Sequence, residues 1–254
     1  MADTEVSESG RDGATCEILC PRFIPILLKT LAVLGCGFVL ITMILPAVHR
    51  NAEGRRRSQC RHNLHLVAFA LHNYETEYGA LPPAFTVDAN GQRLHSWRTL
   101  ILPYLNQRQL YDRIDLSKPW DDPANAEARG VKVPEYHCPS DSCPPQRTTY
   151  LANIALGGCF RLTEPRLLSE ITDGAFNTVM VIEVPSEKAV PWMSPQDADE
   201  TLIMSMGREA RTAHSGCAHA ALCDGSVRFL SATLPAATCR ALFTIAGGEE
   251  VRDY

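Results

Sequence analysis

The sequence predicts an α+β protein with one long N-terminal helix followed by a sheet-rich head. Three patterns indicate this architecture. They are an apolar run over residues 24–48, an apolar stripe with helical spacing over residues 60–78, and strand and hairpin signals over residues 178–230. We expect the first half of the helix to cross a membrane and the second half to pack on the head.

The apolar run is long enough to cross a bilayer. Pro25 and Pro46 bracket about twenty residues, and a helix of that length spans about 30 Å, the thickness of a hydrocarbon core. Its one charged side chain, Lys29, lies near the start, from where it can reach the lipid headgroups. We therefore predict a disordered acidic tail over residues 1–22 and a single membrane-spanning helix over residues 23–48.

Three other interpretations of this run stay open. A buried core helix of this length normally has a polar face, which this run lacks. A cleaved signal peptide normally starts with basic residues, whereas this chain starts with acidic ones. A lipid-attachment box over residues 33–36 fits poorly, because leucine stands directly before its glycine.

Residues 49–79 are predicted to continue the helix as a spine for the head. Apolar residues recur there at spacings of three and four, which places them on one helix face. These residues are Cys60, Leu64, Val67, Leu71, Tyr74 and Tyr78. Gly79 is expected to end the helix, and the prolines that follow it favour extended backbone. The globular head then comprises residues 80–254.

Strand and turn signals follow in the C-terminal third of the chain. The β-branched run over residues 178–184 predicts a mostly buried strand. Residues 217–223 and 226–230 predict a hairpin around Asp224 and Gly225, a pair that supplies the positive φ angles of a tight turn. The head is therefore expected to contain a sheet.

The charge of the chain argues against a nucleic-acid binder. The formal net charge is -5. Arginines do cluster directly after the apolar run, at Arg50, Arg55, Arg56, Arg57 and Arg61. At that position, a solvated helix surface or one facing lipid headgroups is the favoured interpretation.

Several sequence blocks occur in the order typical of one bacterial family. The first blocks are residues 56–64 and 70–74, and further blocks follow at residues 96–105, 110–111, 119–125, 138–141, 149–152, 171–178 and 190–197. The last block is His214, nine further residues, and then Asp224-Gly225. With these blocks, the chain from Pro46 onwards resembles the domain-of-unknown-function family 1559, whose members are pilin-like.

The resemblance implies a pilin-like fold, in which the N-terminal helix packs on an antiparallel sheet. It also implies a membrane-anchored, pseudopilin-like structural or interaction protein of the cell envelope. Structural motif roles are implied for residues of two blocks: Asp173, Gly174, His214, Asp224 and Gly225.

The chain departs from the family at its start. Members usually begin with a prepilin segment that holds a processing glycine and a glutamate used in subunit assembly. Here the corresponding positions hold Ile24 and Lys29. We therefore expect an unprocessed, permanent anchor rather than a filament subunit.

Two arguments about topology disagree. Five arginines follow the apolar run, against Arg11, Arg22 and Lys29 before it, and this bias alone would keep the head in the cytoplasm. The resemblance places the head outside, and long domains can cross a membrane despite flanking charge. We expect a single-pass protein of the inner (cytoplasmic) membrane with an extracytoplasmic C-terminal head.

The ten cysteines agree with an oxidising compartment. Cys60 belongs to the helical stripe, and Cys138 belongs to a block shared with the family. A disulfide between Cys60 and Cys138 is therefore the first hypothesis. Two buried free thiols are the alternative.

One grouping of side chains has the chemistry of a metal site. His214, His219, Asp224 and Glu183 offer imidazole and carboxylate groups, which suit zinc and similar ions. Hydrogen bonds that fix the hairpin explain His214 and Asp224 better. The chain has no phosphate-binding loop and no nucleophile elbow. We therefore expect no catalytic residue, no cofactor and no metal.

Two alternatives to a structural or interaction protein stay open. One is an extracytoplasmic ligand-binding module that uses the loops between Leu81 and Pro145. The other is a metal-dependent enzyme that uses the region of His214 and Asp224. The expected partners are the membrane and homo- or hetero-oligomeric envelope partners, with no nucleic acid and no known small molecule.

Overall fold

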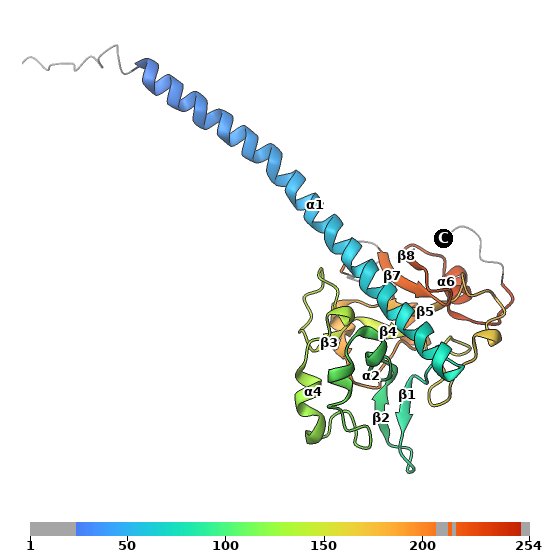
Figure 1. The fold of residues 1–254 in the computed structure, drawn as a ribbon. Coiled ribbons are helices and arrows are strands. Elements are labelled where there is room, and N and C mark those ends of the chain that lie inside the picture. Colours follow the sequence, from blue (N-terminus) through green and yellow to red (C-terminus); the bar gives the residue numbers. More distant parts are fainter. Residues whose placement is uncertain (1–23, 207–212, 215–216, 250–254) are drawn as a thin grey trace, which may run out of the picture. The chain divides into compact units, whose positions relative to one another are not determined.

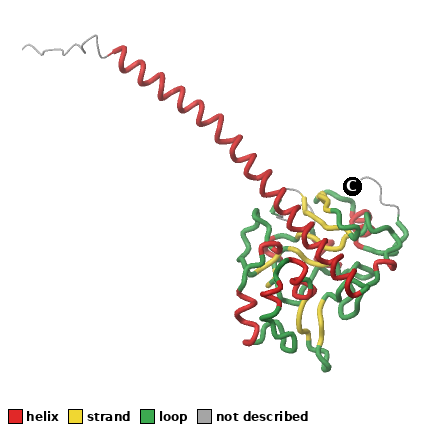
Figure 2. Tube along the Cα trace, viewed as in Figure 1, coloured by secondary structure: helices red, strands yellow, loops and turns green. Residues whose placement is uncertain are grey.

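The computed structural model describes residues 24–206, 213–214 and 217–249, so the predicted tail over residues 1–22 lies outside the described residues. The chain divides into two units, residues 1–51 and 52–254. Figures 1 and 2 show the elements. The helices are α1 (Ile24–Tyr78), α2 (Trp97–Leu100), α3 (Arg108–Tyr111), α4 (Ala126–Gly130), α5 (Glu200–Ser205) and α6 (Ala236–Phe243). The strands are β1 (Phe85–Val87), β2 (Arg93–Ser96), β3 (Arg147–Thr148), β4 (Tyr150–Ala152), β5 (Val179–Glu183), β6 (Val190–Pro191), β7 (Cys217–Leu222) and β8 (Val227–Ser231).

Among the residues that the structure describes, no helix combines the length and the apolar character that a membrane crossing requires.

The second unit is built on an antiparallel sheet, which confirms the predicted α+β class. Its strand order is β4-β5-β7-β8, and each neighbouring pair is antiparallel. Two short antiparallel pairs, β1 with β2 and β3 with β6, lie outside this sheet. All five residues of β5 are buried, as the β-branched run predicted.

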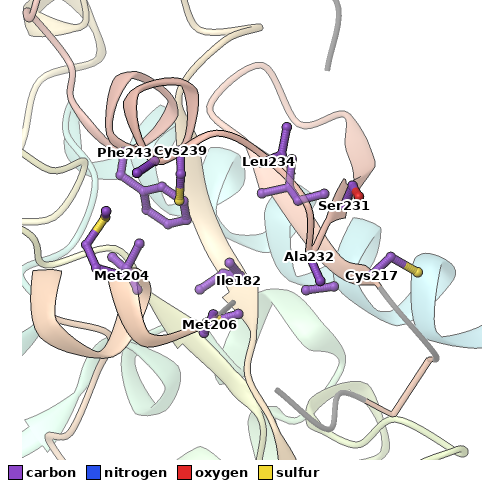
Figure 3. A pocket seen from close by; sticks show the side chains of 13 residues that line it. Ile182, Met204, Met206, Cys217, Ser231, Ala232, Leu234, Cys239 and Phe243 are labelled. Carbon is purple, nitrogen blue, oxygen red and sulfur yellow. The ribbon is translucent and has the colours of Figure 1, made fainter. Parts of the chain in front are cut away.

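One face of the sheet packs against α5 and α6. Alternate strand residues such as Leu151, Ala220 and Leu222 form an apolar cluster there with Leu242 of α6. A pocket of about 220 Å³ lies within this layer (Figure 3). The pocket is lined mostly by aliphatic side chains.

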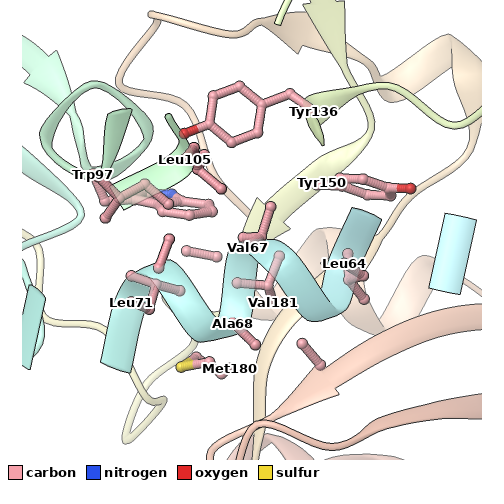
Figure 4. Close-up of a cluster of buried hydrophobic side chains, with 14 of the residues drawn as sticks. Leu64, Val67, Ala68, Leu71, Trp97, Leu105, Tyr136, Tyr150, Met180 and Val181 are labelled. Carbon is pink, nitrogen blue, oxygen red and sulfur yellow. The ribbon is translucent and has the colours of Figure 1, made fainter. Parts of the chain in front are cut away.

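The other face of the sheet packs against the part of α1 that belongs to the second unit. Leu64, Val67 and Leu71 of α1 lie in one apolar cluster with Tyr150 and Val181 of the sheet (Figure 4). Each of these five side chains is fully buried. This part of the helix is therefore a structural element of the core and not an appendage.

The predicted helical stripe is confirmed except at its last position. Cys60, Leu64, Val67 and Leu71 have no exposed surface, but Tyr78 is 61% exposed and stacks on Tyr74. The stripe is wrong at Tyr78 because the helix ends there. Gly79 follows in the left-handed conformation, with φ of 77°, and its N–H donates to the carbonyl of Glu75.

The hairpin between β7 and β8 forms where it was predicted, with a different turn. The N–H of Leu222 donates to the carbonyl of Ser226, so the loop has three residues and not two. Gly225 has φ of 84°, whereas Asp224 is absent from the positive-φ positions among the described residues. Asp224 instead accepts hydrogen bonds from the backbone N–H and the hydroxyl of Ser226. The Asp-Gly pair therefore supplies one positive φ angle and one side-chain cap.

Replacing Gly225 by alanine is expected to lower the free energy of unfolding by about 1–2 kcal/mol, because a Cβ is unfavourable at positive φ. An added Cβ would meet only the His72 ring at an ordinary contact distance of 3.5 Å, so strain and not a clash is the cause. Urea denaturation measures the change. Gly130→Ala is the matched control, since Gly130 has open space around it and no positive φ. This variant should change the free energy of unfolding by less than about 0.5 kcal/mol in either direction.

A buried ion pair between Arg98 and Asp197 connects α2 to the edge strand β4. The Arg98 guanidinium and the Asp197 carboxylate are 2.7 Å apart, and their side chains are 0% and 1% exposed. Asp197 also accepts hydrogen bonds from Trp97 Nε1 and from the N–H of Ala152 in β4. The remaining guanidinium N–H groups donate to the carbonyls of Tyr150, Trp192, Ser194 and Gln196.

Burial and the charge of Arg98 shift the pKa of Asp197 in opposite directions. Burial raises the pKa of Asp197, while the charge of Arg98 and the hydrogen bonds from Trp97, Ala152 and Arg98 oppose that rise. Because all five guanidinium N–H groups have acceptors, Arg98 connects segments that the sequence places far apart.

Candidate functional site

A row of large side chains crosses the sheet on the face toward α1. Tyr150 of β4 is paired with Glu183 of β5, and the register of β5 and β7 continues the row to His219. His219 Nδ1 lies 2.7 Å from Glu183 Oε2, and both side chains have no exposed surface. The row continues to Phe229 of β8, whose ring lies 4.3 Å from the His219 ring. A carboxyl group and an imidazole are therefore held in the interior of the head.

A disulfide lies beside this row. Cys60 of α1 is joined to Cys138, with 5.0 Å between their Cα atoms. The hydroxyl of Tyr150 lies 3.4 Å from the carbonyl oxygen of Cys60, so the row and the helix meet at this point. Burial, together with the nearby charge of Glu183, raises the pKa of Tyr150 well above its usual range, which keeps this hydroxyl protonated.

His214 completes the cluster from the segment before β7. Its ring lies edge-on to the His219 ring, with 4.7 Å between centroids, and its Nε2 lies 3.5 Å from Cys138 Sγ. One ligand atom each from Cys60, Cys138, Glu183 and His214 can be chosen so that all four lie within 4.8 Å of one another. We call these four residues, together with Glu53 and His219, the buried cluster.

Glu53 orients the ring of His214. Its Oε1 lies 3.0 Å from His214 Nδ1, and its side chain is 36% exposed. Partial burial tends to raise the pKa of Glu53, but hydrogen bonds from His214 and Arg56 outweigh it and lower the pKa. The carboxylate therefore stays charged and accepts a hydrogen bond from the Nδ1–H group, which directs Nε2 toward the sulfur atoms.

The sequence analysis did not single out Glu53. The signal that reveals it is spacing, since Glu53 precedes Cys60 by seven residues, or two helical turns, on the same face. Its role was hidden because the stripe was defined by apolar residues only.

Two polar atoms of the buried cluster have no hydrogen-bond partner among the described residues. They are Glu183 Oε1 and His219 Nε2. A buried polar atom without a partner is costly, typically about 1–3 kcal/mol.

The structure brings together only part of the one grouping that the sequence offered as a possible metal site. His214, His219 and Glu183 converge, but Asp224 lies in the turn after β7, whereas His214 lies before that strand. A six-residue strand separates them, so Asp224 is at the opposite end of β7. The side chain of His214 contacts Glu53 of α1 and packs edge-on against His219 of β7.

The residues of the other structural motif lie near the C-terminal helix. The two carboxylate oxygens of Asp173 accept hydrogen bonds from the N–H groups of Gly247 and Gly248, at 2.6 and 3.0 Å. Gly174 has φ of 95°, which favours glycine. Gly225 contacts the helix, because its carbonyl lies 3.1 Å from His65 Nδ1. These three residues hold loops in place.

The pocket in Figure 3 offers little chemistry. Two half-buried thiols, Cys217 and Cys239, line it, and burial raises the pKa of each. A protonated thiol is a weak nucleophile. The volume of about 220 Å³ is also below that of most ligand pockets, which hold about 300–1,000 Å³.

A second hollow involves the loops that the ligand-binding alternative would use. A groove of about 440 Å³ lies between α1 and the segment of residues 132–139. His137 lines it, and burial together with the charge of Lys132 lowers the pKa of this imidazole. Asn63 of α1 is tied to the carbonyls of Pro134 and His137, so the groove wall is held by hydrogen bonds.

Comparison with known proteins identifies similarity in the second part of α1 and the first half of the head. Residues 52–155 match the sequence model of a family described as "Protein of unknown function (DUF1559)". This match supports the family resemblance and begins where the second unit begins. The C-terminal block of His214, Asp224 and Gly225 lies beyond the matched residues. No curated protein and no solved structure matches the chain.

Proposed function

We propose that this protein is a membrane-anchored, pilin-like structural or interaction protein of the cell envelope. The apolar run over residues 24–48 is the anchor, and the head meets other proteins outside the cytoplasm. The observation that supports this proposal is that α1 is one helix from Ile24 to Tyr78. The apolar run and the core stripe therefore belong to a single element, which suits a spine that connects an anchor to a head.

The disulfide fits such a spine. It joins the helix at Cys60 to a loop of the head at Cys138. A covalent link at this place would transmit force between anchor and head without relying on apolar packing alone. A disulfide also persists best in an oxidising compartment, which agrees with an extracytoplasmic head.

The anchor is tested by carbonate extraction of membranes that contain the full chain. The protein should stay in the membrane pellet. Leu34→Arg with Phe38→Arg should release it, because each arginine at the centre of a span costs about 2.5–3.5 kcal/mol. Leu34→Ala with Phe38→Leu is the matched control and should stay in the pellet. Release of the unaltered chain would contradict a membrane anchor.

The side of the membrane is tested by a topology reporter fused after Tyr254. An extracytoplasmic signal is the expected result. A cytoplasmic signal would overturn the location of the head and the pilin-like role together.

The connection between β4 and β5 is the surface that best suits protein contacts. Four large apolar side chains are exposed there: Leu156 at 88%, Phe176 at 55%, Leu167 at 50% and Leu162 at 48%. Exposed apolar residues that gather in one segment often mark interaction sites. A photo-crosslinking residue at Leu156 should give larger products in native membranes, whereas one at buried Leu102 should not. A head that stays monomeric in both cases would count against assembly.

The proposal includes no catalytic role. The imidazole and carboxyl groups of His214, His219 and Glu183 have no exposed surface, so a substrate has no direct access to them. The two sulfur atoms beside them are joined in a disulfide and are not nucleophiles.

A further inference from the structure

We propose that reduction of the Cys60–Cys138 disulfide turns the buried cluster into a binding site for a thiophilic divalent cation of the Zn²⁺ type. The ligands are the two sulfur atoms, His214 Nε2 and a carboxylate oxygen of Glu183. The disulfide and the bound metal exclude each other, because both use the sulfur atoms of Cys60 and Cys138. This inference is independent of the membrane anchor and goes beyond the proposed structural role.

The geometry of the four ligands carries the proposal. In a tetrahedral zinc site, Zn–S distances of about 2.3 Å and Zn–N or Zn–O distances of about 2.0–2.2 Å separate the ligand atoms by about 3.3–3.8 Å. The four ligand atoms here already lie within 4.8 Å of one another. The sulfur atoms must move apart, which breaking their bond allows. The remaining atoms need to approach by about 1–1.5 Å at most.

Two further residues, Glu53 and His219, hold the ligand side chains in position, as the neighbours of metal ligands usually do. Histidines that bind metals usually donate their other ring N–H to a carboxylate, which fixes the tautomer and the direction of the ring. His214 has this arrangement, with Nδ1 toward Glu53 and Nε2 toward Cys138 Sγ. His219 Nδ1 holds Glu183 Oε2 in the same way at 2.7 Å. A purely structural disulfide needs neither pair.

The unpartnered carboxylate oxygen supports the same conclusion. Glu183 Oε1 is buried and has no hydrogen-bond partner among the described residues. A cation would satisfy this carboxylate, and its two positive charges would balance the two thiolates. The combination of two thiolates, one imidazole and one carboxylate selects zinc-like ions over Mg²⁺ or Ca²⁺.

The chemistry balances in two steps. A dithiol reductant attacks the disulfide and gives it two electrons and two protons, so the S–S bond breaks, two thiols form and the reductant becomes a disulfide. The divalent cation then displaces one proton from each thiol and forms two metal–thiolate bonds, with release of two protons.

The test uses the full-length chain, reduced with a dithiol that is then removed under anaerobic conditions. Co²⁺ serves as a spectroscopic probe, and Zn²⁺ is measured by equilibrium dialysis. The reduced chain should bind one more equivalent than the reduced Cys60→Ser, Cys138→Ser variant, which reports on the remaining cysteines. The additional Co²⁺ should show thiolate charge-transfer bands and the intense visible bands of a tetrahedral site. The oxidised chain should not bind this equivalent.

A second variant and a second measurement separate ligand loss from misfolding. Glu53→Gln keeps the fold, because Glu53 is partly exposed. It should weaken binding by roughly 10–100-fold and leave the thiolate bands in place. In the unaltered, reduced chain, Zn²⁺ should slow the alkylation of Cys60 and Cys138 relative to the same chain without metal. Equal binding by the disulfide form, equal binding by the double serine variant, or equally fast alkylation of Cys60 and Cys138 with and without Zn²⁺ would each overturn the proposal.

Discussion

Replacing Arg98 by methionine should lower the free energy of unfolding by about 3–5 kcal/mol, because it leaves the Asp197 carboxylate buried without its charged partner. Four backbone carbonyls also lose a donor. Methionine retains most of the side-chain volume, so the loss reports on charge and hydrogen bonding more than on a cavity. Urea denaturation of the full chain measures it.

The loss should depend on pH. Burial already raises the pKa of Asp197 in the folded protein, and removing Arg98 raises it further. A carboxyl whose pKa is higher folded than unfolded favours folding when it is protonated. The variant should therefore lose least below the unfolded pKa of about 3.9 and lose more as the pH rises through the folded pKa.

Arg108→Met is the matched control for charge. Arg108 pairs with Asp112 on the surface, where the side chains are 70% and 56% exposed. Its loss should change stability by less than about 1 kcal/mol. Equal effects at both positions, or an Arg98 effect that is the same at every pH, would contradict the assigned role of the buried pair.

Removing the disulfide should have an effect of similar size. Cys60 and Cys138 are separated by 78 positions, so their bond restricts a long loop in the unfolded chain. The chain-entropy relation gives about 4–5 kcal/mol for such a loop, in the upper part of the range usually measured. The Cys60→Ser, Cys138→Ser variant should therefore unfold at a markedly lower temperature. Calorimetry with a chelator present measures this loss without a contribution from metal.

Reduction provides an independent measurement of the same quantity. The unaltered chain with a reductant and a chelator should shift by about as much as the double variant does without them. Cys239→Ala is the control, since this thiol is free and half-buried, and the variant should respond to the reductant as the unaltered chain does. Non-reducing mass spectrometry that finds both thiols free in the purified protein would contradict the pairing.

Local patterns predicted the elements whose signals lie close together in the chain. The stripe from Cys60 to Leu71 follows helical spacing, and the buried strand β5 follows its β-branched run. The hairpin around Gly225 followed from turn chemistry, although its loop is one residue longer than expected. Short strands such as β3 and β6 have two residues each, which is too short for any period to appear.

Predictions failed where a long-range contact decides the outcome. Asp224 was grouped with His214, but the two lie at opposite ends of β7, since an extended strand carries neighbours in sequence apart. Glu53 lies outside the apolar stripe, so helical spacing of apolar residues did not reveal it. Its partner, His214, is 161 positions away in the chain.

The sequence by itself determined the α+β class, the helical stripe that packs in the core, the hairpin and the family resemblance. Periodicity and turn chemistry are local, so neighbouring residues suffice to specify them. Only the tertiary structure decided the Arg98–Asp197 pair and the buried cluster. These sites join segments far apart in the chain, with 99 positions between Arg98 and Asp197 and 161 between Glu53 and His214. Their chemistry depends on burial and on distances of a few ångströms, which exist only after the helix and the sheet have packed together.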